Sequence, residues 1–231
     1  MISHKHKCIF IHIPKAAGTS IENVFLEDLG LDMKNRHSLL IGKNTNKTIG
    51  PRRVSHLLAK EYVDLHFISQ ALFDEYFKFA FIRNPYDRLY STYKYRKFDD
   101  YLTFDSYIKL KLESFIFSPS EGFFFKPQHE YLYRSEKCLV DFVGRFENLE
   151  EDFRYVQKKL NLLHASLKHH NKSKPSKGII RKIRIIGKII KDYSAWPYLS
   201  SSKSNNTLSH EAKNLILKYY IKDFETFNYE I

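Results

Sequence analysis

The stretch Cys8-Ile9-Phe10-Ile11-His12-Ile13-Pro14-Lys15-Ala16-Ala17-Gly18-Thr19-Ser20 decides the fold that the sequence predicts. It begins with the β-branched and aromatic residues typical of a buried strand and then turns at Pro14. The chain continues with Ile21, Val24 and Phe25 at helical spacing. The pattern therefore predicts a strand, a tight loop and a helix.

The loop of this unit has the residues of an anion-binding site. Gly18 lets a ligand approach the backbone closely, and the first N–H groups of the following helix have no partner inside the helix. Lys15 adds a positive charge, and Thr19 and Ser20 add hydroxyl groups. We expect a phosphate here. A nucleotide P-loop has its Lys directly after the last Gly, whereas Lys15 precedes Gly18 by three residues, which disfavours an ordinary ATPase.

The composition is that of a folded protein. A chain of 231 residues, 43% of them hydrophobic, can bury a sizeable core, and we expect a single domain over residues 1–231. No apolar run approaches the ~20 residues of a membrane span. Because residues 1–7 lead directly into the first strand, no export signal or membrane anchor is predicted, and a microbial chain of this kind would be cytoplasmic.

The net charge of +12 comes from one part of the chain. Between Asp152 and Asp192 there is no acidic residue, and the twelve Lys and Arg side chains of this stretch equal the whole excess of positive charge. A local basic surface indicates an anionic partner, with a solvated basic face as the alternative. No nucleic-acid-binding motif accompanies the stretch, so we expect no nucleic acid partner; an anionic cofactor or an acidic polysaccharide would suit it.

A second strand, loop and helix follow the same logic. Residues 77–82 are predicted to form a buried strand, and Pro85 suits the first position of the next helix. Arg83 leaves the carboxyl end of this strand, where ligands bind in parallel sheets, and Ser91 lies two turns along the helix. A guanidinium here would suit a second phosphate. The alternative is that Arg83 pairs with Asp87 and that Ser91 only packs.

Histidine is the side chain best suited to proton transfer near neutral pH, and the chain has eleven. In the stretch of residues 54–62, Ser55 could cap a short helix, which would place His56 in its first turn. Sequence position alone does not favour His56 over His37 or His66 as a general base.

The two loops together resemble those of the carbohydrate sulfotransferases that use 3′-phosphoadenosine 5′-phosphosulfate (PAPS), a group related to heparan sulfate 2-O-sulfotransferases and chondroitin sulfotransferases. The family's H-I-P-K-x-A-G-T-S loop stands here at residues 12–20, and its R-N-P-x-x-R-x-x-S motif stands at residues 83–91. The similarity continues through five further segments, at residues 55–57, 128–132, 143–153, 170–173 and 219–227.

This resemblance implies an α/β fold, with a central, mainly parallel sheet flanked by helices as in the P-loop NTPases. It implies transfer of a sulfuryl group from PAPS to a hydroxyl of a carbohydrate, without a metal. The residues that it assigns to the 5′-phosphosulfate are Lys15, Ala17, Gly18, Thr19 and Ser20.

The resemblance also assigns roles at the second loop and in the reaction. Arg83 and Ser91 would hold the 3′-phosphate, and Lys15 would stabilise the charge that develops on the leaving phosphate. It points to His56 as the general base, with His37 and Glu22 in reserve.

Residues 172–206 depart from the family as a basic insertion. Within it Ile179, Ile183, Ile186 and Ile190 fall on one helical face, which could pack on the domain, lie on an anionic membrane or cover the acceptor site. Two other functions stay open: a P-loop kinase-like phosphotransferase, and a non-catalytic module that binds a nucleotide or an anionic glycan. The sequence indicates neither the acceptor sugar nor an oligomeric state.

Overall fold

The computed structural model describes residues 1–32, 34–44, 48–51, 53–162, 167 and 207–231. The predicted basic insertion at 172–206, its isoleucine face and most of the acid-free stretch lie outside the described residues. No helix of the described part is long and apolar enough to cross a membrane.

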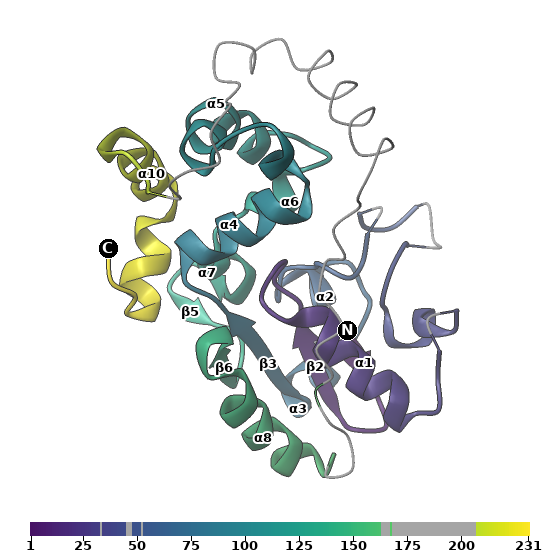
Figure 1. Ribbon diagram of the computed structural model, residues 1–231. Coiled ribbons are helices and arrows are strands. Elements are labelled where there is room, and N and C mark those ends of the chain that lie inside the picture. The colour runs from purple at the N-terminus through teal and green to yellow at the C-terminus, as the bar shows by residue number, and fades with distance from the viewer. Residues whose placement is uncertain (33, 45–47, 52, 163–166, 168–206) are drawn as a thin grey trace. The chain divides into compact units, whose positions relative to one another are not determined.

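A four-stranded sheet in the order β1-β2-β3-β6 organises the first part of the fold (Figure 1). Its strands are β1 (Ile2–Ser3), β2 (Cys8–Ile11), β3 (Phe77–Ile82) and β6 (Phe142–Arg145). The edge strand β1 is antiparallel to β2, whereas β2, β3 and β6 are parallel. The predicted fold class, a mainly parallel sheet flanked by helices, is confirmed.

Helices α1 (Gly18–Asp28) and α8 (Leu149–Leu160) pack on one face of this sheet. Phe10 and Phe79 are register partners on that face, and both are almost fully buried. They share one hydrophobic cluster with the apolar side chains of the two helices: Ile21, Val24, Phe25, Leu26, Phe153 and Val156. The helical spacing read from the sequence after Ser20 is thus confirmed, because it produces the apolar face that α1 buries.

The remaining elements of this part are short. They are η1 (Arg36–Leu39), α2 (Glu61–Asp64), α3 (Gln70–Glu75), α7 (Gln128–Leu132), η3 (Phe146–Asn148) and a hairpin of β4 (Tyr133–Arg134) with β5 (Lys137–Cys138).

The described chain divides into two units, each with its own core. One unit contains Met1–Asn84 and the described residues from Pro127 to Leu167; the other contains Pro85–Lys126 and residues 207–231. The second unit is helical and consists of α4 (Pro85–Tyr95), η2 (Phe98–Asp100), α5 (Phe104–Ile116), α6 (Gly122–Phe125) and α10 (His210–Phe227). The single domain expected over residues 1–231 stays a prediction.

The prediction of a helix capped by Ser55 is wrong. Residues 54–60 form an irregular segment with two short turns, and the helix α2 begins only at Glu61. The Ser55 hydroxyl accepts the N–H of Gly42 at 2.6 Å, and the N–H of Ala59 donates to the carbonyl of Tyr131 at 2.8 Å. These distant partners replace the local cap and the first helical hydrogen bonds.

Gly144 on β6 lies opposite Phe81 on β3, and a Cβ atom at this glycine would lie 2.5 Å from the Phe81 ring. We therefore expect Gly144→Ala to lower the free energy of unfolding by about 1–3 kcal/mol through overpacking, measured by urea denaturation. Adding Phe81→Leu should recover part of that loss. Additive effects in the double mutant would contradict the contact.

Candidate active site

The loop between β2 and α1 has the backbone of an anion site. Lys15 (φ 69°) and Ala17 (φ 65°) adopt left-handed conformations, and Ala17 directly precedes the helix. A left-handed residue followed by a helical one, Gly18, turns successive N–H groups toward a common point. The N–H groups of Ser20 and Ile21 already donate to the Ala17 carbonyl. The N–H groups before them are the ones that a bound anion would meet.

Gly18 has a packing role besides the close ligand approach expected from the sequence. A Cβ atom at this position would lie 2.0 Å from the imidazole of His12, so only glycine fits beside that ring. His12 therefore supports the loop from the side of the sheet.

Lys15 and Arg83 lie in the loops that follow two neighbouring parallel strands, β2 and β3, and are close enough to interact electrostatically. Burial, and after it the positive charge of Arg83, lowers the pKa of Lys15 to about 8. Two cations in one partly buried place repel each other, and a bound anion relieves that repulsion.

Arg83 is held by residues far away in sequence. The buried side chain of Gln128 accepts the Arg83 N–H at 2.9 Å and donates to the Arg83 carbonyl at 2.7 Å. The guanidinium lies 4.1 Å from the centre of the Phe146 ring. The Glu147 carboxylate accepts the N–H of Asn84 at 2.7 Å. The turn after β3 is thus fixed by α7 and η3.

His56 is oriented by the backbone of His12. Its Nδ1 lies 3.0 Å from the His12 carbonyl oxygen. Because a carbonyl oxygen only accepts, Nδ1 carries the hydrogen and the lone pair of the neutral ring is on Nε2. Burial, followed by the charge of His12, holds the pKa of His56 well below its usual value of 6.5. The ring is therefore neutral near pH 7, as a general base must be.

The other residues predicted for the site lie on different elements. Ser91 lies half-buried on α4, in the second unit. His37 lies in η1, and Glu22 is buried, with its Oε1 2.7 Å from Nδ1 of His12. Within the described residues, no group of three His, Cys, Asp or Glu side chains could hold a metal ion.

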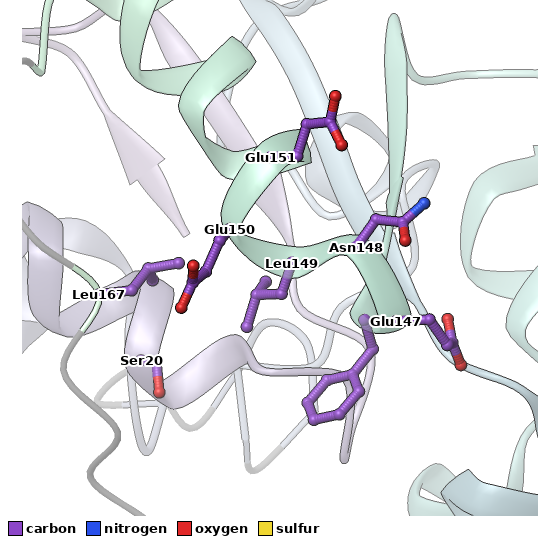
Figure 2. A pocket seen from close by; sticks show the side chains of 8 residues that line it. Ser20, Glu147, Asn148, Leu149, Glu150, Glu151 and Leu167 are labelled. Carbon is purple, nitrogen blue, oxygen red and sulfur yellow. The ribbon is translucent and has the colours of Figure 1, made fainter.

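A pocket of about 390 Å³ opens beside Ser20 (Figure 2). It is lined by Ser20, Phe146, Glu147, Asn148, Leu149, Glu150, Glu151 and Leu167. Its three carboxylates would repel a phosphate, whereas an aromatic ring and an amide suit an uncharged planar group. Two lining residues connect the pocket to the two loops. Ser20 follows the first loop, and the ring of Phe146 also contacts the Arg83 guanidinium.

The sulfotransferase family profile matches residues 1–230. The chain belongs to the sulfotransferase family. It is also 38% identical, over 97 residues, to an uncharacterized protein of Archaeoglobus fulgidus; the match covers 41% of this chain and 76% of that protein. Membership in the family supports an enzyme that transfers a sulfuryl group, and sulfotransferases of this family generally take that group from PAPS.

Sequence reasoning assigned no role to three residues of this sulfotransferase that shape the site: His12, Gln128 and Glu147. Each of them stands in a segment that the resemblance singled out. Their partners lie between 6 and 63 positions away, so no periodic pattern could reveal the contacts.

Gln128 gives a direct test of how Arg83 is held. Gln128→Ala leaves the N–H and the C=O of Arg83 without this partner, and we expect a loss of about 1–3 kcal/mol in the free energy of unfolding. Gln70→Ala, at an exposed helical glutamine, is the matched control and should change stability by less than about 0.5 kcal/mol. Equal effects of the two substitutions in urea denaturation would contradict the role of Gln128.

Proposed function

We propose that this protein transfers a sulfuryl group from PAPS to a hydroxyl of a carbohydrate acceptor. The observation that carries the proposal is the approach of Lys15 to Arg83, each placed by a strand end at the same edge of a parallel sheet. Two cations with a loop of inward-turned N–H groups suit a ligand with more than one anionic group, as PAPS has.

The residues suit the parts of this donor in different ways. The loop residues Lys15, Ala17, Gly18, Thr19 and Ser20 would bind the 5′-phosphosulfate through N–H groups, hydroxyls and one ammonium. Arg83 would bind the 3′-phosphate, because a planar guanidinium can donate two parallel hydrogen bonds to it. The resemblance assigns Ser91 to the same phosphate. The uncharged adenine would suit the pocket beside Ser20 and Phe146.

The proposed chemistry needs a cation and a base. As the acceptor oxygen attacks sulfur, negative charge grows on the bridging oxygen of the leaving phosphate, and the Lys15 ammonium would stabilise it. Nε2 of neutral His56 would accept the proton of the attacking hydroxyl. A phosphotransferase of the P-loop type would instead place an acidic metal ligand at the position directly after β3, where this chain has Arg83.

The carbohydrate acceptor rests on the resemblance and on the charge of the sequence. An anionic polysaccharide would suit the acid-free stretch between Asp152 and Asp192. A panel of polysaccharides offered with radiolabelled donor would identify the acceptor.

Binding of adenosine 3′,5′-bisphosphate, the product left by PAPS, tests the donor site by calorimetry. We expect the protein to bind it and Arg83→Ala to weaken binding roughly 10- to 150-fold, as loss of a charge-assisted phosphate contact does. Arg134→Ala, at an exposed arginine that pairs with Asp64, is the control and should keep the parental affinity. A parental affinity in Arg83→Ala would remove the second loop from the donor site, and no binding by the parent would overturn the proposed function.

The two pKa shifts predict how kcat/KM for the donor depends on pH. Lys15 must be charged and its pKa is about 8, so activity should fall as the pH rises through about 8. His56 must be neutral and its pKa is lowered, so the acidic fall should lie well below pH 6.5. In Lys15→Arg the alkaline fall should disappear from the residual activity, because a guanidinium stays charged. An unchanged alkaline fall in that variant would assign it to another group.

A further inference from the structure

The imidazole of His12 contacts both halves of the candidate site. Its ring meets that of His56 edge-on, with 4.4 Å between the ring centres, and it also stacks on the Phe10 ring. It also lies directly beside Gly18, where a Cβ atom would overlap it. A shift of the buried His12 ring would therefore displace both the anion loop at Gly18 and the candidate base His56.

Glu22 fixes the ring of His12. Its Oε1 lies 2.7 Å from Nδ1, and both side chains are only 9% exposed. Burial opposes the ionisation of Glu22, but the charge and the hydrogen bond of His12 prevail and lower the pKa of this carboxyl group. An ionised carboxylate only accepts, so Nδ1 of His12 is the donor. Glu22 lies one helical turn after Gly18 on α1, so the carboxylate that fixes the His12 ring belongs to the same helix as the end of the loop.

The groups around the His12 ring leave Glu22 as the residue that orients it. Within the described residues, the other titratable and charged groups that act on this pair and on His56 include the α-amino group of Met1, the hydroxyl of Tyr62, Arg36 and Arg53. The two arginines are cations, and burial lowers the pKa of the Met1 amino group to about 5. Among these groups Glu22 is thus the anion that bonds to His12.

We propose that Glu22 and His12 are positioning residues that couple the anion loop to His56. Glu22 aligns the His12 ring, and that ring, wedged between Gly18 and His56, keeps the His56 imidazole in the orientation in which Nδ1 donates to the His12 carbonyl and Nε2 is the base. The proposal rests on the proposed function, in which His56 takes the acceptor proton.

Two substitutions separate this role from simple packing. Glu22→Gln keeps an oxygen for the hydrogen bond but removes the charge that orients His12. His12→Asn keeps a side-chain N–H for Glu22 but removes the ring. Glu27→Gln, an exposed position on the same helix, makes the same charge change away from the site and is the matched control.

The primary measurement is the imidazole nitrogen NMR spectrum of His56, assigned with His56→Gln and recorded with and without adenosine 3′,5′-bisphosphate. The parent and Glu27→Gln should show the Nδ1–H tautomer and a shift of the His56 signals when the bisphosphate binds. In Glu22→Gln and His12→Asn we expect mixed tautomers and no such shift. Turnover of radiolabelled donor should fall roughly tenfold, a part of what a general base supplies, while bisphosphate affinity changes less than about threefold.

A purely structural pair would give a different result. If both variants melt at a lower temperature but keep the His56 tautomer, its response to the bisphosphate and the parental turnover, the positioning role is overturned. If Glu22→Gln does not fold, His12→Asn, which keeps a donor for Glu22, decides by the same measurements. The tautomer is read without ligand, so failure of the parent to bind the bisphosphate would refute the proposed function separately from this inference.

Discussion

The parallel pairing of β2 with β3 is the constraint on which the candidate site depends. Ile11 pairs with Ala80 near the ends of both strands, so the two following loops leave the same edge of the sheet. This register brings Lys15 close to Arg83, although 67 residues separate them in the sequence. In an antiparallel pair the two loops would leave opposite edges, and the two cations could not share a ligand.

Arg83 is held by neutral and apolar contacts. Gln128 binds the backbone of Arg83 with an uncharged amide, and Phe146 lies under the guanidinium. A carboxylate in either place would attract the guanidinium and compete with an anionic ligand. On the other loop, the Glu22 carboxylate accepts a hydrogen bond from Nδ1 of His12. The protein thus supports Arg83 without neutralising its charge.

Sequence patterns could predict the elements whose signals are local. The strand and helix around Pro14 and those around Pro85 form as expected, because apolar periodicity and turn residues act within a few positions. The helix expected at Ser55 fails because its hydroxyl bonds to Gly42, 13 residues away. The contact of Gln128 with Arg83 spans 45 residues and leaves no periodic trace. Family resemblance marked that segment without giving its role.

The electrostatics of the site suit transfer of a proton from an acceptor hydroxyl to His56. Burial and neighbouring cations lower the pKa values of both Lys15 and His56, yet from different starting points: 10.5 for the lysine and 6.5 for the histidine. With the pKa of Lys15 at about 8 and that of His56 well below 6.5, a window around neutral pH has a charged lysine and a neutral histidine. Binding of an anion would raise the pKa of Lys15 and widen this window on the alkaline side. Burial is the largest cause of both shifts, with Arg83 acting on Lys15 and His12 acting on His56. Burial of the site therefore serves both groups: it keeps His56 unprotonated, as a base must be, and it strengthens the interaction of the Lys15 charge with a leaving group.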